Sequence, residues 1–136
     1  MPPDGDEVRR WVSKASNDRN VARIIVSSGC AETDVAAFHC QQSIEKLLKA
    51  FLVYRNVEFE RVHDLGRLLD QASDLDPDFE LLRDDVAPLT MYAVTFRYPG
   101  PTDPTPQQVA NALRIVDRVW EFAISRLPPD VLPQNE

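Results

Sequence analysis

One stretch of the sequence places polar side chains of binding or catalytic type at helical spacing. His39, Gln42, Lys46 and Lys49 follow one another at intervals of three, four and three residues. Residues three or four apart lie one above the other on a helix, so these side chains form one row, which we call the polar line. Its ammonium groups suit phosphate as point charges. The polar line is therefore a candidate groove for a nucleotide phosphate or a partner protein.

Two more polar residues, Gln41 and Glu45, fall on the apolar side of the same helix. That side also holds Ala37, Phe38, Cys40, Ile44, Leu47, Leu48, Phe51 and Leu52. A buried polar group without a partner costs roughly 1–3 kcal/mol, and an unpaired charge costs more. We therefore interpret Gln41 and Glu45 as structural residues and expect each to have polar neighbours.

A carboxylate, Asp18, stands at the apolar seam of an earlier helix, between Ala15 and Ala22. One interpretation is a carboxylate at the widened edge of the seam. Another is a partner for Lys46 or Lys49 of the polar line, or for an arginine on another helix.

Helices must position these groups, and capping residues, prolines and glycines in the sequence predict where each helix begins and ends. We expect helices over about 6–27, from a cap at Thr33 or Asp34 to about Arg55, and from a cap at His63 or Asp64. Asp76-Pro77 starts a helix that reaches about Arg97 in two pieces because of Pro88. Thr105-Pro106-Gln107-Gln108 is the signature of a capped start for the last helix. No strand-like alternation competes, so the fold class is all-α.

Length and composition limit the classes of protein. The 136 residues suit one domain over 1–127, followed by a flexible tail over 128–136. The net charge of −7 argues against holding nucleic acid by bulk attraction, although residues 9–23 carry five basic side chains against one acidic. No apolar run approaches the ~20 residues of a membrane span, so we expect a cytoplasmic protein. Two cysteines without metal-site spacing predict no disulfide framework, no metal and no cofactor.

These residues resemble the HEPN family of helical domains from prokaryotic nucleotidyltransferase-associated proteins. The most specific match is the segment from Phe38 to Ala50. Weaker matches, in the expected order, are Trp11 with Ala15 and Asp18-Arg19, His63-Asp64-Leu65, and Arg97-Tyr98-Pro99. The resemblance covers about residues 8–127. It implies an up-and-down four-helix bundle with an additional short helix, which is usually a homodimer.

The resemblance also implies work near nucleotides or RNA, often beside a minimal nucleotidyltransferase in a toxin–antitoxin pair. Many family members are metal-independent ribonucleases, whose signature is an arginine followed after four to six residues by a histidine, late in the domain. This sequence lacks the signature. Its only histidines are His39 and His63, the arginines nearest before His63, Arg61 and Arg55, leave one and seven residues between, and no histidine follows Arg97.

Three functional hypotheses remain open at this stage. The first is a binding or regulatory module in which the polar line and Arg97 hold a nucleotide or RNA phosphate or receive a partner protein. The second is a ribonuclease toxin with a non-standard site, Arg97 with His39 or His63, since cleavage through the 2′-hydroxyl needs a general acid or base and a cation for the phosphate. The third is a purely structural dimerisation module. In it, the polar residues satisfy one another inside the bundle and at a dimer seam, with no ligand, and those expected to be structural are Asp18, Gln41, Glu45 and Asp64.

Overall fold

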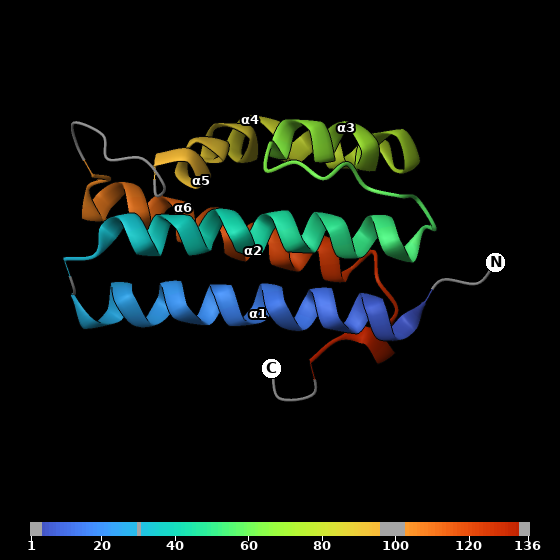
Figure 1. The fold of residues 1–136 in the computed structure, drawn as a ribbon, viewed down its shortest axis with the longest axis horizontal. Helices are drawn as coiled ribbons and strands as arrows, with labels where there is room; N and C mark the ends of the chain where they lie inside the picture. Colours follow the sequence, from blue (N-terminus) through green and yellow to red (C-terminus); the bar gives the residue numbers. More distant parts are fainter. Residues whose placement is uncertain (1–3, 30, 96–102, 134–136) are drawn as a thin grey trace.

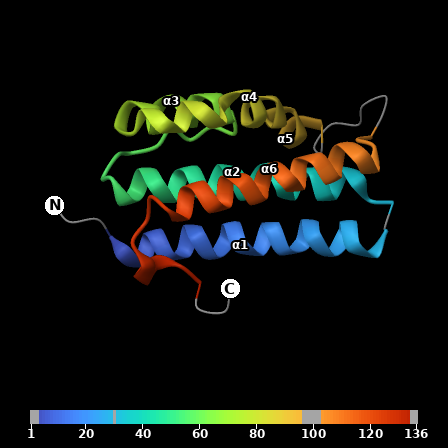
Figure 2. The ribbon, with the colours of Figure 1, turned by 180° about the vertical axis from the view of Figure 1, so that it is seen from behind.

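Four rods of helix run alternately up and down and form the bundle (Figures 1 and 2). The computed structural model describes residues 4–29, 31–95 and 103–133, and this part of the chain contains helices and no strand. The rods are α1 (Gly5–Ser28), α2 (Thr33–Tyr54), a broken rod over 77–95, and α6 (Pro106–Ile124). The short helix α3 (Leu65–Leu75) is additional. The predicted fold class is confirmed.

The helix α2 lies at the centre, with α1, α3, α5 and α6 packed around it. Its side chains explain the position, since Ile44, Leu47, Leu48, Phe51 and Leu52 are almost completely buried. Small residues let α1 come close: Ala15 and Ala22 are fully buried, and the hydroxyl of Ser43 donates to the carbonyl of Ala15 at 2.8 Å. The helix that carries the polar line is thus also the core helix.

Local sequence explains both ends of α1. The Asp4 carboxylate accepts from the backbone N–H groups of Asp6 and Glu7, and Gly29 ends the helix with φ 69°, in the left-handed region that glycine adopts without strain. The predicted start of α2 is wrong in detail. Its capping position is Glu32, which makes no side-chain cap, while Asp34 lies in the first turn, where its charge suits the helix dipole.

The broken rod differs from the expected two pieces. It consists of the 3₁₀ helix η1 (Pro77–Leu82), α4 (Arg83–Val86), the 3₁₀ helix η2 (Ala87–Thr90) and α5 (Met91–Thr95). Pro77 lies in the first turn of η1, where a missing N–H costs no hydrogen bond. Pro88 lies just beyond α4 and has no N–H to continue its α-helical hydrogen bonds, and the chain changes there to the 3₁₀ geometry of η2. Phe79, Leu82, Val86 and Leu89 remain buried through these changes of geometry.

The last helix begins as predicted. Thr105 Oγ1 accepts from the N–H of Gln108, and the Gln108 side chain accepts from the N–H of Thr105, which completes the capping box. Towards α1, Asp117 of α6 pairs with Arg19 at 2.9 Å and Arg23 at 3.4 Å. This bridge fastens the last helix to the first.

The segment after α6 differs from the expected flexible tail. Pro129–Val131 forms the 3₁₀ helix η3, which packs against α1, and Val131 is buried. The backbone carbonyl of Asp130 also accepts from Arg9 at 3.3 Å. Val131 and the partly buried Leu132 therefore anchor this stretch against the core, although its prolines and polar residues predicted a loose tail. Residues 134–136 lie outside the described part. No described helix is long and apolar enough to cross a membrane.

Candidate functional site

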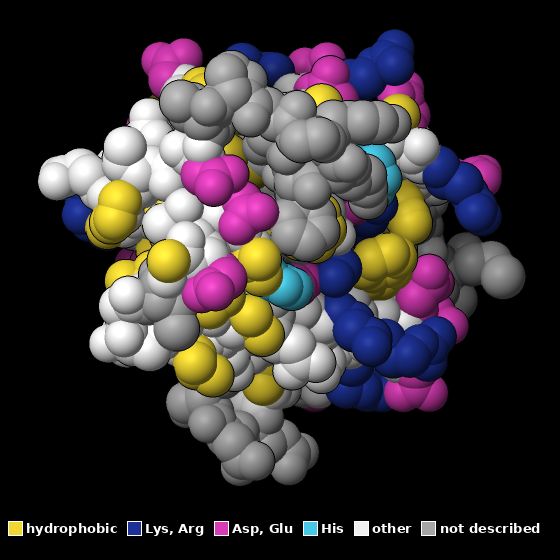
Figure 3. Space-filling view, turned by 60° about the vertical axis from the view of Figure 1, so that its left-hand side comes forward, with side chains coloured by type: hydrophobic (Ala, Val, Ile, Leu, Met, Phe, Trp, Pro, Cys, Tyr) yellow, Lys and Arg dark blue, Asp and Glu magenta, His cyan; other side chains and the backbone are white. Residues whose placement is uncertain are grey.

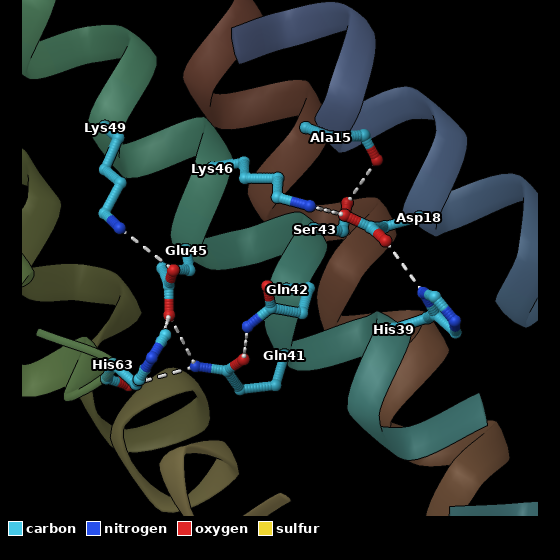
Figure 4. Close-up of polar contacts among 10 residues, drawn as sticks. All are labelled: Ala15, Asp18, His39, Gln41, Gln42, Ser43, Glu45, Lys46, Lys49 and His63. Atoms are coloured by element: carbon cyan, nitrogen blue, oxygen red, sulfur yellow. Dashed lines mark hydrogen bonds and ion pairs between the residues drawn. The ribbon is translucent and has the colours of Figure 1, made fainter. Parts of the chain in front are cut away.

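Asp18 of α1 is the centre of a polar cluster between α1 and α2 (Figure 4). One carboxylate oxygen lies 2.7 Å from His39 Nδ1, and the other accepts from Lys46 Nζ at 2.6 Å. The Asp18 side chain is 10% exposed, whereas those of His39 and Lys46 are 25% and 22% exposed. The first and third residues of the polar line therefore share one carboxylate at the edge of the solvent, and one predicted partner of Asp18 is found.

A second cluster surrounds Glu45 on the side of α2 that faces the start of α3 (Figure 4). The Glu45 carboxylate accepts from Lys49 Nζ at 3.0 Å and from Gln41 at 3.2 Å, and it lies 2.9 Å from His63 Nδ1. Burial alone raises the pKa of Glu45, but hydrogen bonds from His63, Lys49 and Gln41 outweigh it and hold the pKa below its ordinary value. Glu45 is therefore a buried carboxylate with its partners in place.

Gln41 and Gln42 link α2 to the chain before α3. Gln42 donates to the Gln41 side chain at 2.6 Å, and Gln41 donates to the backbone carbonyl of His63 at 3.0 Å. Asp64 caps α3 by accepting from the N–H of Gly66 at 2.9 Å, as predicted. These contacts fix the entry of the chain into α3, and they give Gln41, Glu45 and Asp64 hydrogen-bond partners within the protein.

The structure divides the polar line into an outer and an inner half. His39 and Lys46 reach the surface beside Asp18, whereas Gln42 and Lys49 are buried. Lys49 also lies 5.5 Å from the ring centre of Trp11 and 5.0 Å from that of Phe59. A ligand approaching from solvent therefore meets His39 and Lys46 and not the inner pair.

The two candidate general bases do not share a site. His39 belongs to the Asp18 cluster and His63 to the Glu45 cluster (Figure 4). The third candidate for catalysis, Arg97, lies outside the described residues. Within the described ranges, no three His, Cys, Asp or Glu side chains gather as metal ligands.

A shallow depression beside the Asp18 cluster adds residues that the sequence analysis did not assign to the site. It has a volume of about 470 Å³, and it is lined by Glu7, Arg10, Trp11, Lys14 and Lys46. Arg10 and Lys14 are exposed, and neither forms an ion pair with another residue in the described ranges. We call this depression the basic recess. Figure 3 shows Lys and Arg side chains gathered beside hydrophobic ones on this face of the molecule.

The sequence contains a signal for the basic recess. Glu7, Trp11, Lys14 and Asp18 follow at intervals of four, three and four, which places them on one stripe of α1. The excess of basic residues over 9–23 did not show which of them would lie together. The missing information was that this stripe lies beside Lys46 of α2, which depends on how the two helices are rotated against each other.

Comparison with known proteins agrees with this architecture. The sequence matches the HEPN domain family over residues 8–127, so the chain belongs to the HEPN family. No curated protein matches it significantly. Among solved structures, it is similar to TT1696 from Thermus thermophilus, with 25% identity, a TM-score of 0.73, and coverage of 88% of this chain and 98% of the other. It is also similar in fold to ST0689, an archaeal HEPN homologue, with 22% identity, a TM-score of 0.70, and coverage of 89% and 98%.

Proposed function

We propose that this HEPN domain is a binding or regulatory module for a phosphate-bearing ligand, a nucleotide or RNA, which docks where the polar line meets the basic recess. The observation that carries the proposal is the position of Lys46. Its ammonium group is bound to Asp18 beside His39, and its side chain also lines the recess with Arg10 and Lys14. Cations from two helices thus converge in a chain of net charge −7.

The recess carries three cationic side chains, those of Arg10, Lys14 and Lys46, against the one carboxylate of Glu7, so its charges favour an anionic ligand. Asp18 offsets part of the charge of Lys46 and orients its Nζ. Arg10 and Lys14 form no ion pair with another described residue, so their positive charges are available to bind an anionic ligand. Lysine binds phosphate as a point charge and arginine as a planar fork, so the set suits phosphate oxygens. The neighbouring hollow near the start of α1 is less suitable, because Asp4, Glu7 and Glu58 line it against Arg61.

The polar line contributes to this site through His39 and Lys46. Gln42 and Lys49 support it from within, because they hold the Gln41–Glu45 network that fixes the inner face of α2. Arg97, which lies outside the described residues, is a further candidate phosphate ligand because its guanidinium group suits phosphate. The family resemblance supports a homodimer and a minimal nucleotidyltransferase as the partner, in a pair of toxin–antitoxin type.

Binding of a fluorescently labelled ATP analogue and of a labelled oligoribonucleotide tests the proposal. We expect Lys46→Ala and Arg97→Ala each to weaken binding about fivefold or more, and higher salt to weaken it further. Arg114→Ala removes an exposed charge from α6, away from the recess, and serves as the control. Unchanged affinity in both Lys46→Ala and Arg97→Ala removes the proposal.

Co-purification from the native host tests the nucleotidyltransferase partner. Light scattering tests the homodimer, which should have twice the chain mass of 15.4 kDa.

A second function, metal-independent ribonuclease activity, is favoured by one contact. Because a carboxylate accepts, His39 Nδ1 carries the proton in its contact with Asp18, and Nε2 is left for proton transfer. The second ring nitrogen of His39 points away from Asp18 in Figure 4. The test is cleavage of RNA by the purified protein and by His39→Ala. Intact RNA, together with normal growth of cells that express the chain alone, rejects this function.

A further inference from the structure

Trp11 gives the basic recess an aromatic surface as well as a charged one. The indole is half-buried, and its inner part packs against the core, with the ring of Phe59 edge-on at 5.4 Å and 84°. Lys49, held by Glu45, lies 5.5 Å from the ring centre. The remaining surface of the indole lines the recess. Trp11 is thus a rigid ring with one part fixed in the core and another open to a ligand.

The cations stand next to this ring along α1. Arg10 precedes Trp11 and Lys14 follows it by three residues, while Lys46 reaches the same recess from α2. Glu7 also lines the recess, so three cations stand against one carboxylate there. An aromatic plane flanked by cations is the combination with which proteins bind unpaired nucleotides, since the base stacks on the ring and the phosphates meet the charges. A volume of about 470 Å³ lies within the range of small-ligand sites.

We propose that the basic recess is a subsite for one unpaired nucleotide of a single-stranded RNA, with the base stacked on Trp11 and its flanking phosphates on Arg10 and Lys14. This inference rests on the proposed function and makes it narrower. The ligand is recognised by an exposed base and not by phosphate charge alone. A duplex cannot satisfy the site, because its bases are already stacked and paired.

Fluorescence of Trp11 reports on the subsite directly. The chain has two tryptophans, and Trp120 is 5% exposed, so Trp120→Phe leaves Trp11 as the only indole. We expect a five-nucleotide oligouridylate to quench this emission in a saturable way. Tripolyphosphate, which has charge but no base, should compete for binding without quenching. Saturable binding of the oligonucleotide without any change in Trp11 emission overturns the stacking proposal.

Variants separate this inference from the proposed function. With a labelled oligouridylate, we expect Trp11→Leu to weaken binding about fivefold or more, Trp11→Phe to weaken it less, and Arg10→Ala and Lys14→Ala to weaken it severalfold. Circular dichroism establishes that each variant is folded, and Arg10 and Lys14 are exposed enough for their replacement to leave the core intact. Loss of binding in Lys46→Ala but full affinity in Trp11→Leu overturns the subsite alone. Absence of binding by the unaltered chain to ATP analogue and RNA alike overturns both proposals. Tighter binding of a duplex, or of an acidic peptide, than of the single strand also contradicts the subsite.

Discussion

Asp18 is the residue that holds His39 and Lys46, the exposed half of the polar line, in position. It lies in the α1–α2 interface and accepts from both His39 and Lys46. Its removal leaves two donors without their partner at a position that is mostly buried. The contacts of Asp18 with His39 and Lys46 should therefore contribute more to the free energy of unfolding than an exposed ion pair, which usually contributes about 0–1 kcal/mol.

We predict that Asp18→Ala lowers the free energy of unfolding by about 1–3 kcal/mol in urea titrations. The control is Asp85→Ala, which removes the partner of Arg118 from an exposed pair and should cost at most about 1 kcal/mol. Equal small effects in the two variants would show that the Asp18 cluster adds nothing beyond a surface ion pair.

Glu45 predicts a pH dependence of stability. Its pKa is held below the ordinary value in the folded state, so its ionised form stabilises the fold. The contribution is complete above the unfolded-state pKa of about 4.3 and is lost as the pH falls through the lower folded-state pKa. We expect Glu45→Gln to cost about 1–3 kcal/mol at pH 7.

The unfolding free energies of the unaltered chain and Glu45→Gln, measured between pH 6 and pH 3.5, test this sign. The difference between the two proteins should shrink as the pH falls. A difference that stays constant or grows would mean that the carboxylate is not stabilised by its contacts with His63, Lys49 and Gln41.

Cys40 should be chemically inert in the folded protein. Burial, with a smaller contribution from the charge of Asp117, raises the pKa of its thiol to about 12. In Cys30→Ser, where Cys40 is the only thiol, we expect no reaction with Ellman's reagent at pH 8 until guanidinium unfolds the chain. Stoichiometric reaction of the native protein within minutes would show that Cys40 is not held in the core.

At the residue scale, the sequence indicated which side chains are polar partners but not how they pair. Glu45 and Lys49 are four residues apart on α2, so their contact was available from spacing alone. Whether Asp18 reaches Lys46 or Lys49 depends on the rotation of α1 against α2, which side-chain packing across the interface decides. For the same reason the basic recess was not predicted, since it joins side chains of two helices.

At the scale of elements, predictions succeeded where the signal is local. The start of α6 is determined by three neighbouring residues, Thr105, Pro106 and Gln108, whose side chains and backbone satisfy one another. The broken rod was predicted less well. Proline is accepted in the first turn of either an α-helix or a 3₁₀ helix, so its position does not determine which of the two forms. The packing of Phe79, Leu82 and Leu89 on the bundle decides between them.

The capping box at the start of α6 should contribute measurably to stability. Thr105→Ala should cost about 1 kcal/mol of unfolding free energy, because the N–H of Gln108 loses its acceptor. The matched control is Thr33→Ala at the start of α2, where no side chain caps the helix and the change should stay within about 0.5 kcal/mol. Equal effects of the two substitutions in urea titrations would contradict a stabilising box.

For the whole molecule, the apolar periodicity was sufficient for the fold class, because the predicted elements show helical spacing of apolar residues and none shows strand-like alternation. The C-terminal segment shows the limit of that approach. Its proline-rich composition predicts a loose tail. In the structure, Val131 is buried where η3 packs against α1, and no local sequence pattern predicts this contact.

The distribution of charge matters more for function than its total. A net charge of −7 opposes sequence-independent attraction to RNA, so any binding depends on the few cations that the fold gathers around Lys46. Such a site should bind short ligands and should not coat long nucleic acid. This separates a nucleotide-binding module from a bulk RNA-binding surface.

The most direct test of the proposed site is the map of amide and indole NMR shifts when the labelled protein is titrated with a short oligoribonucleotide. We expect saturable shifts at Arg10, Trp11, Lys14, His39 and Lys46, with little change around Glu58 and Arg61. Shifts concentrated instead in the hollow lined by Asp4, Glu58 and Arg61, or a spectrum that does not change at all, would contradict ligand binding at the basic recess.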